Sequence, residues 1–79
     1  MFGEYLRKRR LGLREGDRNY SVRKVADRVG IEPSYLSKIE RGEQPPPSTA
    51  TIRRLAADLA EDADVLLALA GKIDDDLRA

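Results

Sequence analysis

Apolar residues recur every three or four positions along most of the chain, and this spacing is typical of amphipathic α-helices. A first helix is predicted over residues 2–13, where basic residues separate the apolar ones. Its apolar positions are Phe2, Tyr5, Leu6 and Leu13. The next six residues, REGDRN, contain Gly, Asp and Asn and interrupt the spacing, so residues 14–19 are predicted to form a loop.

Two short helices separated by a tight turn are predicted next. Ser21 is a good N-cap for a helix of about eight residues that ends at Gly30. Its apolar stripe consists of Val22, Val25, Ala26 and Val29. Pro33 suits a first helical position, because its missing N–H would be unpaired there in any case. A third helix is therefore predicted over residues 33–41, with Gly42 ending it and with Tyr35, Leu36 and Ile39 turned inward.

The second half of the chain predicts two more helices after a stiff connector. Pro45, Pro46 and Pro47 favour an extended segment. Ser48 and Asp62 are predicted N-caps of the fourth and fifth helices. The expected core positions are Ile52, Leu55, Ala56 and Leu59 in the fourth helix and Val65, Leu66 and Leu69 in the fifth. The predicted fold class is all-α, with five short helices around one small core.

The composition fits one small helical domain and argues against an enzyme. The 79 residues are 41% hydrophobic and 37% charged, with only four aromatic residues. Cys and His are both absent, which removes thiolate metal sites and the most frequent general base. The chain also lacks a Gly-rich phosphate loop and a plausible carboxylate constellation. We therefore expect no catalytic site, no metal and no cofactor.

The apolar runs are too short for a membrane span. The longest, residues 65–70, is six residues long, whereas a transmembrane helix needs roughly 20. The chain does not open with a basic segment followed by an apolar one, as a secretory signal would. A soluble, cytoplasmic protein is the simplest expectation.

Charge is distributed unevenly along the chain. Residues 1–54 carry a net charge of +6 and residues 55–79 a net charge of −5, although the whole chain carries only +1. A basic body with an acidic end indicates an anionic partner on one side. Solvated helix faces with uneven sampling of charges are an equally good explanation from charge alone.

The segment SVRKVADRVGIEPSYLSKIERG resembles the helix-turn-helix DNA-binding domains of the phage repressor (Cro/CI, XRE) family. The most specific positions of the match are Ala26, Gly30, Leu36, Ser37, Ile39, Glu40, Gly42 and Pro47. The resemblance extends over about residues 4–71 and implies a compact five-helix domain similar to the lambda repressor. Residues 1–71 would then form the helix-turn-helix DNA-binding domain, and residues 72–79 an acidic tail or a dimerisation extension. The resemblance also implies a homodimeric transcriptional regulator, a repressor by expectation, that binds a palindromic operator in double-stranded DNA.

The resemblance assigns residues 33–41 as the recognition helix. An exposed helix of this kind fits the major groove of B-DNA, where its side chains reach base edges. Ser34 and Ser37 would bind bases, and Lys38 would bind guanine or a phosphate. The full set of candidate DNA-binding residues is Ser21, Val22, Arg23, Glu32, Pro33, Ser34, Ser37, Lys38, Arg41, Gln44 and Ser48. An ordinary solvated helix face is the alternative for the three polar residues of this helix.

Several positions depart from the family pattern. Val22 and Pro33 stand where Gln is usual, which removes a phosphate bridge and a base reader. Glu32 stands where Ser or Thr is usual, and its carboxylate would repel phosphate or accept a hydrogen bond from cytosine N4. The loop before the second helix is longer than usual, and its Arg14 and Arg18 are further candidates for phosphate contacts. These departures bear on the operator sequence more than on DNA binding.

Two further expectations concern the inside and the outside of the domain. Arg10 and Glu40 match a family pair and are expected to form a partly buried ion pair; two independent surface charges are the alternative. The expected dimer contacts are Leu67, Ala70, Ile73 and Leu77 in the fifth helix and the tail. Alternatively, Leu67 and Ile73 complete the core of the monomer.

A second class of function remains open at this point. The chain would then be a protein-interaction module with a protein partner, as in an antitoxin, or the DNA-binding part of a larger regulator. The departures at Val22 and Pro33 and the modest net charge favour this alternative. Negligible DNA affinity combined with co-purification of a partner would support it.

Overall fold

The computed structural model describes residues 1–72, and in this part of the chain all regular structure is helical. The elements are α1 (Phe2–Arg14), the 3₁₀-helix η1 (Arg18–Tyr20), α2 (Val22–Val29), α3 (Pro33–Glu40), α4 (Thr49–Asp58) and α5 (Ala63–Leu69). The prediction of an all-α fold with five helices is confirmed for these residues. Ile73 and Leu77 and the question of how the tail is folded lie outside the described residues.

The helix boundaries follow the local signals in the sequence closely. Ser21, Ser48 and Asp62 each accept a hydrogen bond from a backbone N–H in the first turn of the following helix. The predicted loop after α1 differs from expectation, because it contains the short helix η1. The side chain of Asp17 caps η1 by accepting from the backbone N–H of Asn19, at 2.9 Å.

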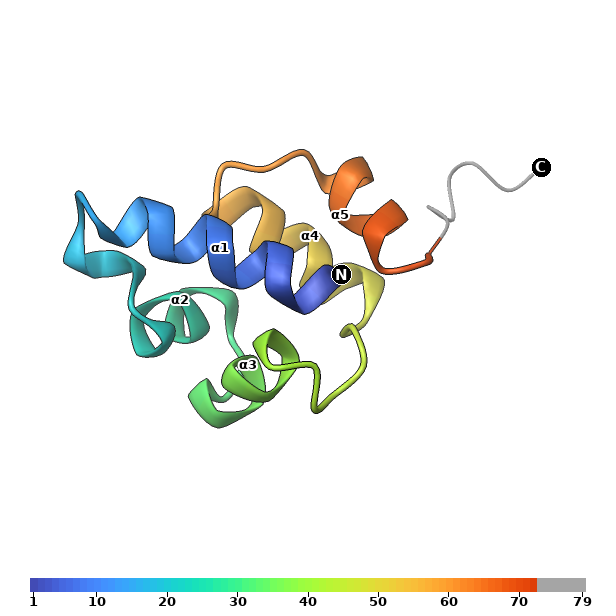
Figure 1. Cartoon of the computed structure of the whole chain (residues 1–79), viewed down its shortest axis with the longest axis horizontal. Helices are drawn as coiled ribbons and strands as arrows, with labels where there is room; N and C mark the ends of the chain where they lie inside the picture. Colours follow the sequence, from blue (N-terminus) through green and yellow to red (C-terminus); the bar gives the residue numbers. More distant parts are fainter. Residues whose placement is uncertain (73–79) are drawn as a thin grey trace.

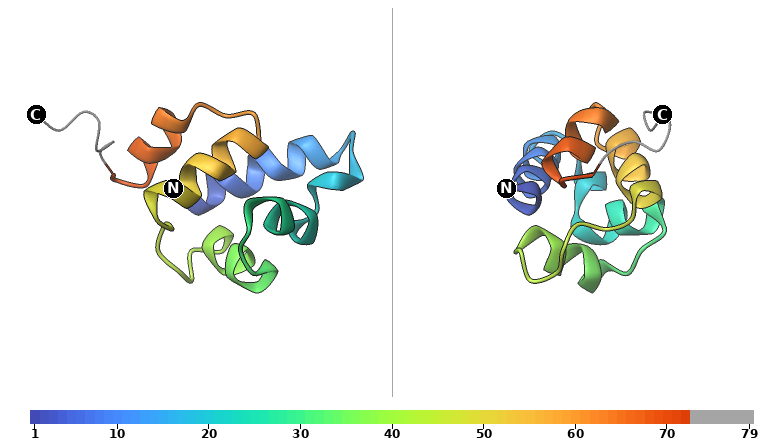
Figure 2. Two further views of the ribbon diagram at one scale, coloured as in Figure 1. Left: turned by 180° about the vertical axis from the view of Figure 1, so that it is seen from behind. Right: turned by 90° about the vertical axis from the view of Figure 1, so that its right-hand side faces the viewer.

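The α-helices pack around one core, with α4 against α5 and α2, and with α3 against α1 and α2. In Figure 1, α1 crosses the middle of the molecule with α4 behind it, α2 and α3 lie below, and α5 lies above. The two further views in Figure 2 agree with this arrangement. The outer surface of α3 is therefore on the opposite side of the domain from α5.

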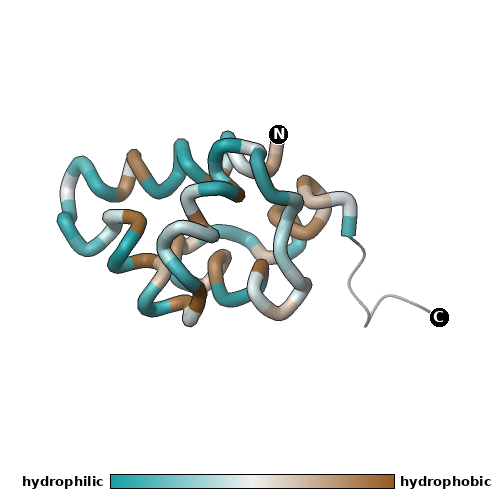
Figure 3. The backbone as a smooth tube through the Cα atoms, turned by 90° about the horizontal axis from the view of Figure 1, so that it is seen from below, coloured by the Kyte–Doolittle hydropathy of each residue, from teal (hydrophilic) through white to brown (hydrophobic). Residues whose placement is uncertain are grey.

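One hydrophobic core receives residues from all five α-helices. Its buried members are Phe2, Leu6, Val25, Ala26, Val29, Leu36, Ile39, Ile52, Leu55, Ala56, Leu59, Leu66 and Leu67. Hydrophobic and hydrophilic segments alternate along the helices in Figure 3, as expected when each helix buries one face. Burying one of the large aliphatic side chains contributes about 1.5 to 3 kcal/mol. Leu36 and Ile39 thus hold α3 to the core and leave its other face in solvent.

The first turn of α1 packs unusually close to the last turn of α3. A Cβ atom at Gly3 would clash with the backbone carbonyl oxygen of Ile39 and press on that of Glu40. The two backbones can approach each other only because Gly3 has no side chain. This contact sets the position of α3 relative to α1.

The predicted orientation of α5 is wrong. Leu67, expected on the dimer surface, is only 2% exposed, and Ala70 is half-buried against the core. Val65 and Leu69, expected inside, are 45% and 42% exposed. The buried stripe consists of Ala63, Leu66, Leu67 and Ala70, spaced for one helix face and packed mainly on α4. Since residues 65–70 are all apolar, their pattern alone does not distinguish these two faces.

The end of α4 offers a direct test of backbone conformation. Ala60 adopts a left-handed backbone with φ of 54°, and the N–H of Glu61 donates to the carbonyl oxygen of Ala56 at 2.8 Å. A side chain is unfavourable in this conformation, so Ala60→Gly is expected to raise the free energy of unfolding by about 0.5 to 1 kcal/mol. Denaturant unfolding followed by circular dichroism measures this change.

The control for this prediction is Ala57→Gly, at an exposed position within α4. There the backbone is helical, so glycine is expected to lower the free energy of unfolding. A loss of stability in Ala60→Gly as well would contradict the assigned conformation of residue 60.

Candidate nucleic-acid interface

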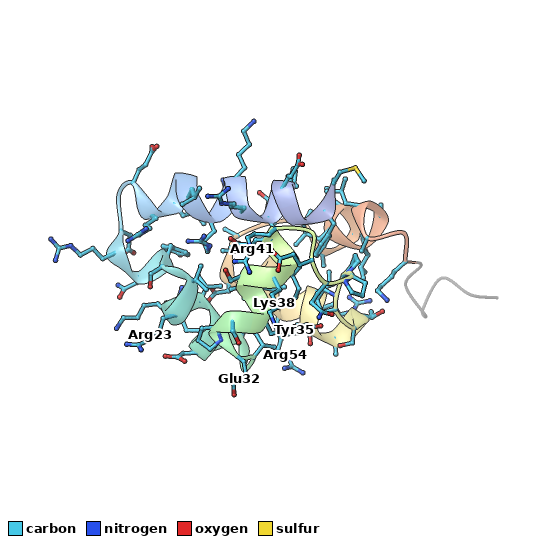
Figure 4. The ribbon with its side chains drawn as sticks, turned by 60° about the horizontal axis from the view of Figure 1, so that its bottom comes forward. Arg23, Glu32, Tyr35, Lys38, Arg41 and Arg54 are labelled. Atoms are coloured by element: carbon cyan, nitrogen blue, oxygen red, sulfur yellow. The ribbon has the colours of Figure 1, made fainter. Side chains whose placement is uncertain are left out.

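The solvent-facing side of α3 carries polar and basic residues. Ser34 and Lys38 are exposed, as is Arg41 directly after the helix, while Ser37 is half-buried between them. Figure 4 looks onto this surface, with Lys38 near its centre, Arg41 towards one end and Glu32 at the other. The predicted recognition residues of α3 therefore share one exposed face.

Basic residues from the neighbouring helices flank this face. Arg23 of α2 lies on one side of α3, and Arg54 of α4 lies near Tyr35 on the other (Figure 4). Nη1 of Arg54 donates to the carbonyl oxygen of Val29 at 3.2 Å, so this side chain also satisfies the end of α2. Arg54 was not predicted from the sequence, because it follows Gly30 by 24 residues. Only the fold brings it beside the turn between α2 and α3.

The N-terminal end of α3 carries the two departures from the family pattern. Glu32 is the exposed N-cap residue, and its side chain makes no capping hydrogen bond. Pro33 follows at the first helical position, which its missing N–H favours, and it is half-buried. The carboxylate of Glu32 is therefore presented to solvent at the tip of the candidate interface.

Three other predicted residues lie at helix ends around α3. Ser21 is half-buried, and its Oγ caps α2 by accepting from the N–H of Lys24 at 3.2 Å. Ser48 is exposed, but its Oγ caps α4 and donates to Oγ1 of Thr51 at 3.1 Å. Gln44 is exposed in the connector after α3. The hydroxyl groups of Ser21 and Ser48 therefore already serve as helix caps.

Val22 occupies a different environment from the polar candidates. It is half-buried and packs on the hydrophobic core. It also lines a shallow groove of about 270 Å³ between α1, α2 and α3. The groove is bordered by Arg7, Arg10, Val22, Ser37, Glu40 and Arg41. Arg7, which sequence analysis did not select, therefore adds a positive charge beside α3.

Arg41 is held by two neighbours on the candidate interface. Its Nε and Nη2 donate to the two carboxylate oxygens of Glu43, at 2.6 and 3.3 Å, and its Nη1 donates to Oγ of Ser37 at 2.6 Å. The hydrogen bond and the charge of Arg41 lower the pKa of Glu43, and Glu43 raises the pKa of Arg41 in the same way. Sequence analysis selected Arg41 and Ser37 but missed Glu43.

The predicted ion pair between Arg10 and Glu40 is present and buried. Nε and Nη2 of Arg10 donate to Oε2 and Oε1 of Glu40 at 2.7 and 2.8 Å, and each residue is 5% exposed. Nη1 of Arg10 donates to the carbonyl oxygen of Tyr20 at 3.2 Å. No buried side-chain nitrogen or oxygen within residues 1–72 lacks a partner. The pair therefore ties α1, η1 and α3 together with its hydrogen-bonding needs met.

A second ion pair fastens α2 to α4. Nε of Arg28 donates to Oδ1 of Asp58 at 2.6 Å, and its guanidinium lies 5.1 Å from the centre of the Tyr20 ring. The hydrogen bond to Asp58 raises the pKa of Arg28. Because the pair is partly exposed, its contribution is small.

On the far side of the domain, the turn after α4 is attached to α1. The hydroxyl of Tyr5 donates to Oε1 of Glu61 at 2.6 Å, which raises the pKa of Tyr5. Nε of Arg9 lies 3.0 Å from Oε2 of the same carboxylate and donates to the carbonyl oxygen of Leu59. These residues stabilise the scaffold away from α3.

The described residues offer little to other kinds of site. Within residues 1–72, no group of three or more acidic side chains is arranged to hold a metal ion. None of the helices in this range combines the length and the apolar character that crossing a membrane requires.

Comparison with known proteins gives the family. The model of a family described as "Helix-turn-helix domain" matches residues 1–69. The chain is 39% identical over 72 residues to an uncharacterized HTH-type transcriptional regulator, RghRB, of Bacillus subtilis (strain 168). The alignment covers 91% of this chain and 48% of the relative, so the chain spans about half the length of this relative. No solved structure matches the chain significantly.

The buried ion pair yields a prediction about stability. Glu40→Ala leaves the guanidinium of Arg10 buried without its carboxylate, and we expect a loss of about 3 to 5 kcal/mol in the free energy of unfolding. The double variant Arg10→Met/Glu40→Leu removes both charges, and it is expected to recover most of this loss. Denaturant unfolding of the wild type, Arg10→Met, Glu40→Leu and the double variant measures the coupling. Additive losses would contradict an interacting buried pair.

Proposed function

The chain belongs to the helix-turn-helix domain family, and on this premise we propose that it is a DNA-binding transcriptional regulator. In this proposal α2 crosses the DNA backbone and α3 enters the major groove, as in other helix-turn-helix proteins. One observation carries the proposal most: α3 is fixed to the core by Leu36 and Ile39 and presents polar and basic side chains on its free face.

The proposed base contacts come from the exposed side of α3. Ser34 and Ser37 are short, so they allow the helix backbone to approach the base edges closely and donate or accept hydrogen bonds there. The longer side chain of Lys38 reaches guanine O6 and N7. Glu32, at the tip of the helix, accepts from an exocyclic amino group of cytosine in this arrangement.

The proposed phosphate contacts surround the base contacts. Arg23 and Arg54 lie on either side of α3 (Figure 4). In this proposal they contact the two DNA backbones that border the major groove. Arg41 lies at the end of α3, and Ser48 with Gln44 lies in the connector that follows. Contacts of this kind position the protein without reading sequence.

The finer features of the proposal concern family subtype, assembly and direction of regulation. We place the chain with the phage repressor (XRE) domains and propose that it represses transcription as a homodimer on a palindromic operator. The exposed apolar side chains of Val65 and Leu69 on α5 support a role for this helix in pairing. Ala70, a predicted dimer contact, is half-buried and offers less exposed surface to a second chain. A twofold dimer places its two reading helices about 34 Å apart.

Selection of bound fragments from a genomic library tests the proposal. At physiological salt, the protein is expected to enrich fragments that share a palindromic site with half-sites about one helical turn apart. Binding that never exceeds the affinity for bulk DNA would contradict the proposed regulator. Analytical ultracentrifugation of the complex reports whether two chains bind each site.

Substitutions on α3 and α2 are expected to act differently. Lys38→Ala should cost about 1 to 3 kcal/mol of discrimination between the selected site and a site changed at one base pair. Arg23→Ala should weaken binding to all sequences alike and reduce the dependence of affinity on salt. Fluorescence anisotropy titrations with both DNAs at several salt concentrations measure both effects.

Lys8→Ala is the matched control for these substitutions. Lys8 is an exposed cation on α1, in a groove that it shares with Tyr5 and Glu61. Its removal changes the net charge by the same amount as Lys38→Ala. Equal effects of the two substitutions on discrimination would contradict the role assigned to Lys38.

A further inference from the structure

The loop after α3 positions one carboxylate beside the basic end of the helix. Gly42 adopts a left-handed backbone with φ of 76°, and its N–H donates to the carbonyl oxygen of Ile39. The N–H of Glu43 donates back to the carbonyl oxygen of Lys38 at 2.8 Å. This pair of hydrogen bonds is a Schellman motif, which folds the chain back over the helix end. Residue 43 is therefore held against α3 by backbone geometry and not only by its side chain.

The planar guanidinium of Arg41 binds the carboxylate of Glu43. Two N–H groups of Arg41 bind its two oxygens, and a third binds Ser37. The fork of an arginine recognises carboxylate and phosphate with the same bidentate geometry. The carboxylate of Glu43 therefore already fills the position on Arg41 that a DNA phosphate would take. A phosphate that binds Arg41 in this way has to displace it.

The charge of Glu43 also acts on the rest of the α3 face. The hydrogen bond and charge of Arg41 lower the pKa of Glu43 most, and the charge of Lys38 lowers it further. Both residues of the Arg41–Glu43 pair are about half exposed, so the pair is weak enough to exchange partners. The pair is therefore suited to open on contact with a polyanion.

We propose that Glu43 is an internal competitor of DNA phosphate for Arg41. The inference rests on the proposed function. In the free protein Arg41 is held by Glu43 and Ser37; on DNA it leaves both and binds a phosphate. The exchange also frees the Oγ lone pair of Ser37, which links the phosphate contact to a base contact by the same residue. Glu43 thereby lowers the affinity for DNA of any sequence and limits retention on non-specific sites.

A double-mutant cycle between Glu43→Gln and Arg41→Ala tests the inference. Glu43→Gln keeps the size of the side chain and removes its charge, and it is expected to raise DNA affinity about threefold to tenfold. It should also steepen the plot of log affinity against log salt by about one unit, because Arg41 then forms its phosphate contact without giving up an ion pair. In the Arg41→Ala background, Glu43→Gln should change affinity by less than twofold.

Asp64→Asn is the matched control. Asp64 is exposed in the first turn of α5, a helix that lies on the other side of α1 from α3 in Figure 1, and its substitution changes the net charge equally. Charges more than about 8 Å from the contact are largely screened at physiological salt, so an effect below twofold is expected. A gain equal to that of Glu43→Gln would show that net charge alone is responsible and would overturn the inference.

The other outcomes separate this inference from the proposed function. An equal gain in DNA affinity from Glu43→Gln with and without Arg41 would mean that Glu43 only repels DNA. No gain in affinity at all would mean that Glu43 has no role in binding. Either result overturns the proposed competition, while the proposal of DNA binding stands. A wild-type protein and a Glu43→Gln variant that both fail to bind DNA would instead refute the proposed function. Because both residues are exposed, folding of the variants is checked by circular dichroism.

A measurement without DNA tests the starting state. The Nε–H group of Arg41 is hydrogen-bonded to Glu43 at 2.6 Å, so its proton should exchange slowly with water in nuclear magnetic resonance spectra of the free protein. Glu43→Gln should accelerate this exchange several-fold, because it removes the carboxylate that holds the Nε–H group. An exchange rate already equal to that of free arginine would overturn the inference.

Discussion

The buried ion pair between Arg10 and Glu40 is the interaction on which the candidate interface depends most. It joins the middle of α1 to the last residue of α3, and the carbonyl oxygen of Tyr20 completes the hydrogen bonds of the guanidinium. Since removing one partner would leave an uncompensated charge inside the domain, the pair opposes any movement of α3 away from α1. The close contact at Gly3 acts in the same direction. A rigid α3 is what a base-reading surface needs, because hydrogen bonds to base edges tolerate little displacement.

Much of the fold could be predicted because its signals are local. Ser21, Ser48 and Asp62 cap the helices that they were predicted to cap, since a capping bond depends on residues only two or three positions apart. The orientation of α5 was not predictable in this way. Residues 65–70 are uniformly apolar, and contact with α4 selects Leu66 and Leu67 for burial.

The candidate site was predictable only in part, for a related reason. The resemblance placed Ser34, Ser37, Lys38 and Arg41 on one helix face, and the structure places them there. Arg54 joins this surface through tertiary packing, which no local pattern encodes. Glu43 joins it through the Schellman motif at Gly42, whose consequence for a side chain is visible only in three dimensions. The surface proposed to bind DNA thus combines a sequence-encoded helix with charges that the fold supplies.

The central claim is that the exposed face of α3 lies in the major groove. Nuclear Overhauser effects between the labelled protein and a selected DNA site test it most directly. The account predicts contacts from the side chains of Ser34, Ser37 and Lys38 to base protons of the major groove. Contacts to DNA from α5 or the outer face of α1, with none from α3, would contradict it.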